Sequence, residues 1–188
     1  MRQTILNKFM ITFALVGLGI AGAATTSNNG SGSTSDAAIA QKLRHEIVMY
    51  SRYTIFDNVN FRVNDGIVEL SGEVTQPFKQ ADLGRIAQRV PGVTSVSNEL
   101  KVLPLSPMDN RLRMQVARAI FRDPVLSRYG MQAIPPIHII VDNGHVTLEG
   151  IVSTDMEKNV AGIRANGAGL SFGQVTNNLR VENPGRHG

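Results

Sequence analysis

The chain has 188 residues, of which 42% are hydrophobic and 18% charged, and it contains neither Cys nor Trp. This hydrophobic fraction argues against wholesale disorder, and the length suits one or two small domains. Without Cys, the composition excludes disulfides, thiolate zinc sites, iron–sulfur clusters, cysteine nucleophiles and a lipidated cysteine anchor. The formal charge is +4, and its meaning depends on where the basic residues lie.

Residues 1–23 are predicted to be a signal peptide. Arg2 and Lys8 precede a 16-residue apolar run from Phe9 to Ala24, and small residues at 21–23 place the cleavage site before Ala24. An uncleaved membrane anchor is the second interpretation, although a spanning helix needs about 20 apolar residues. Cleavage predicts a periplasmic or secreted protein that is not a lipoprotein.

Removal of the signal peptide also removes basic charge. Without Arg2 and Lys8, the 19 basic residues fall to 17 against 15 acidic ones, which lowers the formal charge from +4 to +2. A charge this small argues against nucleic acid as a partner. Residues 24–35 are polar and rich in Gly, Ser and Asn, and we predict a flexible linker because they cannot bury apolar surface.

The remaining sequence contains one pattern twice. Residues 63–74 align with 141–152 at an offset of 78, with six identical positions. Residues 96–102 align with 175–181 at an offset of 79, and three apolar residues of the first copy precede their counterparts by 73 (Ile39, Leu43 and Ile47 with Leu112, Val116 and Ile120). A changing offset indicates insertions between the elements of a duplicated domain. We therefore predict two domains, residues 36–104 and 109–183.

Each copy is predicted to begin with a helix, over 36–50 and 109–122, because apolar residues recur every four positions. Ser35 and Asp109 are the predicted N-caps of these helices. A strand with alternating apolar residues follows in each copy, over 59–63 and 137–141.

The next element is a tight hairpin turn, in which Gly66 and Gly144 follow Asp or Asn and supply a positive φ. The return strands are predicted over 67–74 and 145–152. Gly72 and Gly150 lie late in these strands, where an interior glycine predicts a bulge or a close backbone approach.

A second helix follows in each copy. Pro77 suits the first turn of one helix, and Thr154 or Asp155 is the predicted N-cap of the other. Gly84 and Gly162 lie inside these helices, where each costs about 1 kcal/mol relative to Ala, so we expect close packing of helix against sheet.

A last strand closes each copy, over 96–102 and 175–181, in the direction of the second strand. The element order is therefore αββαβ, and the predicted fold class is α+β. We expect two tandem domains, each with a three-stranded mixed sheet and two helices on one face.

Asn98 and Asn177 occupy equivalent positions in the closing strands. Their parity places them with the apolar residues on the inward face, where a buried amide requires hydrogen-bond partners. We expect each to bind a neighbouring loop or helix end, and a ligand-binding role is the alternative.

The sequence offers no catalytic constellation. None of the four histidines has a metal partner at helical spacing, and no segment matches G-x-S-x-G or a glycine-rich phosphate loop. His138 and His145 lie on the two arms of one hairpin, where a two-ligand metal site is the alternative to a solvated sheet face. We predict no catalytic residues, no metal site and no cofactor.

The opening helix of the second copy is the best candidate for a functional surface. Arg111, Arg118 and Arg122 are seven and four residues apart and share one face, beside a thin apolar stripe (Met114, Ala117 and Phe121). Basic residues flanking exposed apolar side chains are typical of helices that lie on anionic lipid headgroups. The predicted lipid-binding residues are Arg111, Arg113, Arg118, Phe121 and Arg122. The alternative is a charged, solubilising face with Phe121 packed between the domains.

The hairpin pattern V-x-x-G-x-V-x-L-x-G-x-V and the closing pattern V-x-N-x-L-x-V together resemble the BON domain. Both copies carry the two patterns, and residues 91–93 and 157–166 match further parts of the family sequence. Residues 168–173 depart from it, because the family usually has P-G-V and a shorter connection there.

The resemblance implies an exported, non-catalytic module of the cell envelope that is linked to phospholipid binding and osmotic stress. The implied partner is an anionic phospholipid or membrane surface. The alternative is a periplasmic chaperone-like or structural module that binds envelope proteins, since three-stranded sheets leave edge strands open to pairing.

Overall fold

The computed structural model describes residues 35–168 and 174–182. The predicted signal peptide, positions 24–34 of the predicted linker and most of the departing loop at 168–173 lie outside the described residues. Within the described ranges, none of the helices combines the length and apolar character that crossing a bilayer requires.

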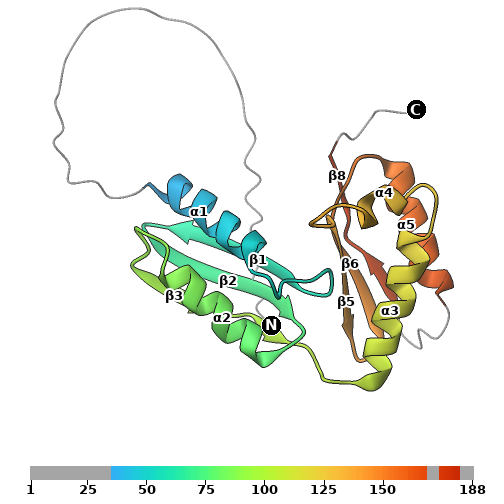
Figure 1. The fold of residues 1–188 in the computed structure, drawn as a ribbon, viewed down its shortest axis with the longest axis horizontal. Helices are drawn as coiled ribbons and strands as arrows, with labels where there is room; N and C mark the ends of the chain where they lie inside the picture. The colour runs from blue at the N-terminus through green and yellow to red at the C-terminus, as the bar shows by residue number, and fades with distance from the viewer. Residues whose placement is uncertain (1–34, 169–173, 183–188) are drawn as a thin grey trace, which may run out of the picture. The chain divides into compact units, whose positions relative to one another are not determined.

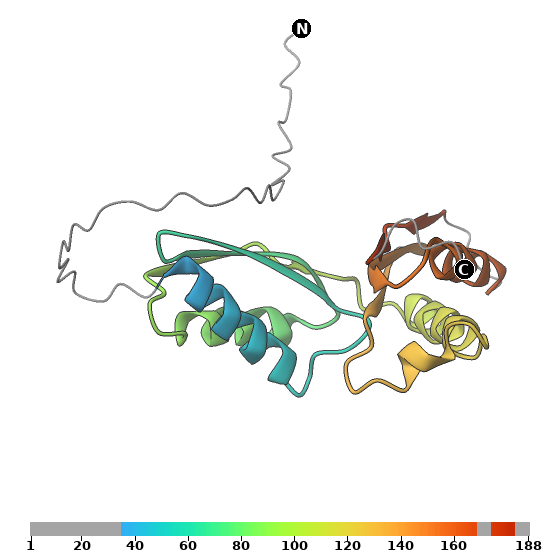
Figure 2. The ribbon, with the colours of Figure 1, turned by 90° about the horizontal axis from the view of Figure 1, so that it is seen from above.

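Domain 1 contains two helices and a mixed sheet (Figure 1). β1 pairs antiparallel with β2, and β2 pairs parallel with β3 and β4. Both helices lie on the same side of the sheet (Figure 2). The elements are α1 (Asp36–Met49), β1 (Asn58–Asn64), β2 (Ile67–Val74), α2 (Pro77–Gln88), β3 (Ser95–Asn98) and β4 (Lys101–Val102).

Domain 2 repeats this order with one addition. β5 pairs antiparallel with β6, which pairs parallel with β7 and β8. The short helix α4 has no counterpart in domain 1 and was not predicted. The elements are α3 (Pro107–Phe121), α4 (Ser127–Gly130), β5 (Ile137–Asp142), β6 (His145–Val152), α5 (Asp155–Gly167), β7 (Val175–Asn177) and β8 (Arg180–Val181).

The architecture is the predicted α+β class, with the closing strand interrupted in each domain. Asn98 Oδ1 accepts a hydrogen bond from Leu100 N at 3.4 Å, and Asn177 Oδ1 accepts one from Leu179 N at 3.3 Å. In each domain, the backbone N–H of the leucine therefore donates to the side chain of the asparagine two residues before it. The leucine side chains are buried, so the interruption inserts an apolar group under each sheet.

Glycine in the second helix of each domain leaves room for these asparagines. A Cβ on Gly84 would lie 2.7 Å from Asn98 Nδ2, and one on Gly162 would lie 2.9 Å from Asn177 Nδ2. The amides donate to Gln80 O at 2.8 Å and to Lys158 O at 2.7 Å. Asn98 is nevertheless exposed and Asn177 is half-buried, which differs from the expected buried position because β3 and β7 are the edges of their sheets.

The start of each domain is fastened to its hairpin turn. The two carboxylate oxygens of Asp36 accept the N–H groups of Asp65 and Gly66, each at 2.9 Å. Asp109 repeats this arrangement with the turn at 143–144, at 3.1 and 2.9 Å. Asp109 is therefore not the predicted N-cap, a position that Ser106 occupies because α3 begins at Pro107.

The N-caps predicted for α1 and α5 are present in the structure. Ser35 accepts a hydrogen bond from Ala38 N and is the N-cap of α1. Thr154 is the N-cap of α5 and forms a capping box with Glu157, in which each side chain accepts the other residue's backbone N–H.

A buried ion pair joins the α1–β1 connection of domain 1 to α2. Lys79 Nζ lies 2.6 Å from Asp57 Oδ2, and the two residues are 5% and 0% exposed. Thr54 and Thr75 donate further hydrogen bonds to the same carboxylate. Burial alone would raise the pKa of Asp57, but the hydrogen bonds from Lys79, Thr54 and Thr75 lower it below its ordinary value.

This arrangement predicts acid-sensitive folding of domain 1. Because the pKa of Asp57 is lower in the folded chain, its contribution is complete above the unfolded-state value of about 3.9 and is lost as the pH falls through the folded value. We expect the Tm of domain 1 to fall steeply below about pH 4. Thermal unfolding between pH 7 and pH 2 measures this, with Asp57→Asn as the control. Equal acid sensitivity of both proteins would contradict the assignment to Asp57.

Candidate functional site

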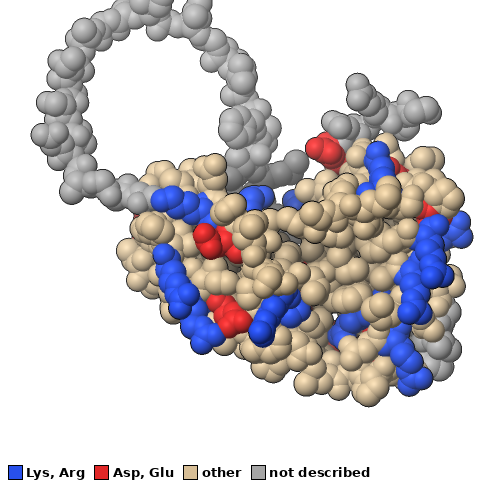
Figure 3. Space-filling view, in the orientation of Figure 1, with Lys and Arg blue, Asp and Glu red and all other residues tan. Residues whose placement is uncertain are grey.

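The exposed arginines of α3 lie on one side of domain 2. Arg111, Arg118 and Arg122 are all exposed, as their spacing predicts. Figure 3 shows Lys and Arg side chains in a column over the α3–α5 side of the domain. Large apolar side chains are exposed on the same two helices, with Met114 at 45% and Ile163 at 67%. Cationic and apolar groups therefore share this surface.

Arg113 does not belong to this surface, so its assignment to the lipid-binding residues is wrong. It is 4% exposed, and its Nη2 donates to Val141 O at 2.7 Å while Nη1 donates to Asn110 Oδ1 at 2.6 Å. Burial lowers the pKa of Arg113, and Asp109 opposes that effect. With 100° per helical residue, Arg113 is turned well away from Arg111 and faces the sheet.

Phe121 is not part of the exposed surface either. It is half-buried and packs against the core of domain 2. A Cβ on Gly130 of α4 would lie 3.0–3.2 Å from three Phe121 carbon atoms, so the ring lies directly against α4. Sequence reasoning did not predict α4, the helix that covers Phe121, and therefore placed Phe121 among the exposed lipid-binding residues.

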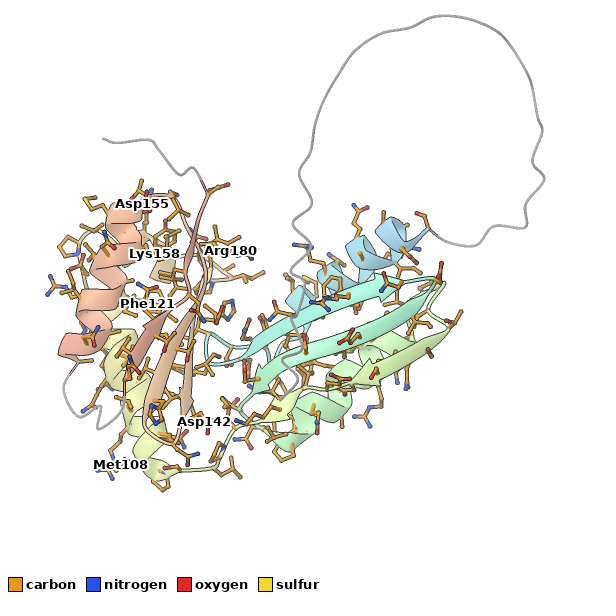
Figure 4. The ribbon with its side chains drawn as sticks, turned by 180° about the vertical axis from the view of Figure 1, so that it is seen from behind. Met108, Phe121, Asp142, Asp155, Lys158 and Arg180 are labelled. Carbon is orange, nitrogen blue, oxygen red and sulfur yellow. The ribbon has the colours of Figure 1, made fainter. Side chains whose placement is uncertain are left out.

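Arg118 and Arg122 of α3 border a groove shared with α5. In Figure 4, Met108 at the start of α3 and Asp155 at the start of α5 lie toward opposite ends of the domain, so the two helices run in opposite directions. The groove lies beside their C-terminal halves and has a volume of 520 Å³. Its lining residues include Arg118, Arg122, Asp123, Pro124, Ile163 and Arg164.

Asp123 holds one of these arginines in place. Arg164 Nε donates to Asp123 Oδ2 at 2.6 Å, and the two side chains are 52% and 3% exposed. Asp123 Oδ1 accepts a hydrogen bond from Val125 N at 2.8 Å. The Val125 N–H lowers the pKa of Asp123, burial opposes this effect, and Arg164 lowers the pKa further. The aspartate is thus a charged partner at neutral pH.

Sequence reasoning did not identify Arg164 or Asp123 as site residues. They are 41 positions apart, so no local spacing connects them. The sequence signal for Arg164 was its position near Gly162. Close packing of the helix at this glycine turns the neighbouring residues, Ile163 and Arg164, toward α3 or solvent.

The two hairpin histidines do not face each other. The strand register pairs His138 with Glu149 and His145 with Asp142. His138 is half-buried beside Tyr53, with ring centroids 5.5 Å apart, and burial lowers its pKa. In the described part of the chain, no three His, Asp or Glu side chains converge as metal ligands would.

Comparison with known proteins identifies a family model for both domains. The BON domain model matches residues 35–104 and 109–183. No curated protein matches the chain.

Two solved structures of CdsD, a structural protein of the type III secretion system of Chlamydia trachomatis, are similar to this chain. The C-terminal domain of CdsD is 15% identical, with a TM-score of 0.31, over 76% of this chain and 63% of that chain. The second structure is 11% identical, with a TM-score of 0.27, over 79% of this chain and 93% of that chain. This chain therefore spans less than two thirds of the first structure.

Proposed function

This chain belongs to the BON domain family, and we propose that it is an exported envelope protein that binds anionic phospholipid membranes through α3 and α5 of domain 2. BON domains are non-catalytic modules that are generally associated with membrane or phospholipid interaction. The observation that carries the proposal is the surface on which Arg111, Arg118 and Arg122 lie beside exposed Met114 and Ile163.

The physical basis is the combination of charge and hydrophobicity. A basic side chain near an anionic membrane surface contributes about 1 kcal/mol of binding free energy. Exposed Met114 and Ile163 add apolar area that leaves water when the helices lie in the headgroup region. The three exposed arginines of α3 (Arg111, Arg118 and Arg122) therefore favour anionic over neutral lipid.

Export and an envelope role rest on the sequence. Residues 1–23 have the composition of a signal peptide, which supports a periplasmic or secreted location. A tandem pair of BON domains behind such a segment resembles the osmotically inducible periplasmic protein Y. We extend the proposal on that basis to maintenance of the envelope during osmotic stress.

Vesicle flotation tests the membrane proposal. The protein is expected to float with vesicles containing phosphatidylglycerol, to float less at high salt, and to remain unbound with phosphatidylcholine alone. Changing Arg111, Arg118 and Arg122 to Glu is expected to weaken binding at least about 100-fold, since three contributions of about 1 kcal/mol are lost.

The matched control makes the same charge change in domain 1. Arg44, Arg62 and Arg89 are exposed, and changing all three to Glu alters the net charge equally. Equal loss of binding by the two variants would show that net charge alone drives association, and would remove domain 2 from the proposal.

A chaperone-like role is the second candidate, because β1 has a strand partner on only one side in the part of domain 1 that is described. An open edge can pair with an extended segment of another protein. Suppression of the aggregation of a denatured protein, together with no binding to anionic vesicles, would favour this role over membrane binding.

A further inference from the structure

We propose that the groove between α3 and α5 binds the phosphate of a single glycerophospholipid headgroup. This inference rests on the proposed membrane function and extends it from a charged surface to one site with named ligands. The phosphate would be bound by Arg118, Arg122 and Arg164, which all line the groove.

The guanidinium of Arg164 is already oriented for such a ligand. Its Nε is bound to Asp123, which is buried and fixed in turn by the Val125 N–H. In the described residues, neither terminal nitrogen of Arg164 forms a hydrogen bond, so both can donate to phosphate oxygens. Because Asp123 already restrains the planar guanidinium, Arg164 loses little side-chain entropy on binding. The planar group also matches the geometry of a phosphate.

The remaining charges of the groove favour an anion. The described residues contain five ion pairs, and neither Arg118 nor Arg122 takes part in one. Asp123 is the one acidic residue among the lining residues, and Arg164 neutralises it. Two unneutralised guanidinium groups therefore remain at the groove.

An exposed apolar side chain indicates that the phosphate comes from a lipid. Ile163 lines the groove and is 67% exposed, and Met156, seven residues earlier on α5, is 60% exposed. A lipid whose phosphate occupies the groove brings its hydrocarbon close to this side of α5. Burial of Ile163 there contributes hydrophobic free energy that a soluble phosphate cannot supply.

Domain 1 provides an internal comparison, because its groove between α1 and α2 has a similar volume of 580 Å³. The offsets of 73 and 78 between the copies place His45, Met49 and Ile86 where domain 2 has its three arginines. A groove at this place is thus common to both domains, whereas the arginine cluster belongs to domain 2. The arginines are therefore not a requirement of the fold.

Replacement of Arg164 by Lys tests the site, because Lys keeps the charge and loses the fork. Binding of the purified protein to vesicles of phosphatidylglycerol and phosphatidylcholine is expected to weaken about tenfold in Arg164→Lys. Arg122→Lys is also expected to weaken binding to these vesicles. The control is Arg62→Lys, which changes an exposed arginine of domain 1, outside the α3–α5 surface, and is expected to leave binding within about twofold. Thermal unfolding verifies that each variant is folded.

A local signal complements the affinity measurement. Phosphatidylglycerol vesicles are expected to shift the NMR resonance of the Arg164 Nε–H, and soluble glycerophosphoglycerol or inorganic phosphate to shift it weakly. Arg164→Lys and Arg62→Lys with equal affinities would overturn the groove site and leave the membrane function standing. A shift with inorganic phosphate, without vesicle binding, would overturn the lipid source and the membrane function. Absence of both vesicle binding and any shift would overturn both proposals.

Discussion

Gly150→Ala is expected to destabilise domain 2 by at least about 3 kcal/mol. Gly150 has φ +120°, a conformation that side chains other than glycine rarely adopt. A Cβ at this position would lie 1.9 Å from Pro136 O, which is backbone and cannot rotate away. Urea denaturation followed by the NMR amide signals of domain 2 measures the loss.

Gly144→Ala is the matched control for this prediction. Gly144 also has a positive φ of 81°, but no atom lies within 4 Å of a Cβ placed there. Its replacement therefore carries only the backbone cost, about 1 kcal/mol. Equal destabilisation by the two substitutions would show that the close approach at Pro136 contributes nothing.

Lys79→Met is the second substitution with a large expected effect. It leaves the carboxylate of Asp57 buried without its cation, which is expected to cost about 3–5 kcal/mol of the unfolding free energy of domain 1. The effect should change little with salt, because a buried pair is poorly screened. Urea denaturation followed by domain 1 amides measures it.

The control for Lys79 is Lys42→Met, which removes an exposed lysine from α1. Its expected effect is within about 0.5 kcal/mol. A loss of under 1 kcal/mol in Lys79→Met would mean that Thr54 and Thr75 alone stabilise the Asp57 carboxylate.

The features that sequence reasoning predicted depend on neighbours along the chain. Asp65–Gly66 specifies a hairpin turn through its own backbone preference, and Ser35 and Thr154 cap helices through bonds to residues three positions away. Apolar spacing was sufficient to place the helices, since periodicity reflects which side of an element is buried.

The features that were missed depend on contacts between distant residues. Lys79 and Asp57 are 22 positions apart, and Arg164 and Asp123 are 41 apart. Arg113 was assigned to the surface by its residue type, although its helical position turns it to the sheet, where the carbonyl of Val141 accepts a hydrogen bond from it. Three of the eight residues that line the groove, including Arg164, thus come from α5, which sequence reasoning had not connected to α3.

The attachment of Asp36 and Asp109 to the hairpin turns has a mechanical consequence. A pulling force applied to the backbone just before either domain acts on a residue whose two carboxylate oxygens are both bonded to the turn. Both bonds must rupture before the helix can unwind beyond this residue, which is the first residue of α1 and the third of α3. We therefore expect each domain to resist extension from the attached aspartate onward, because stretching the chain pulls on the β-hairpin before the rest of the helix can separate from the sheet.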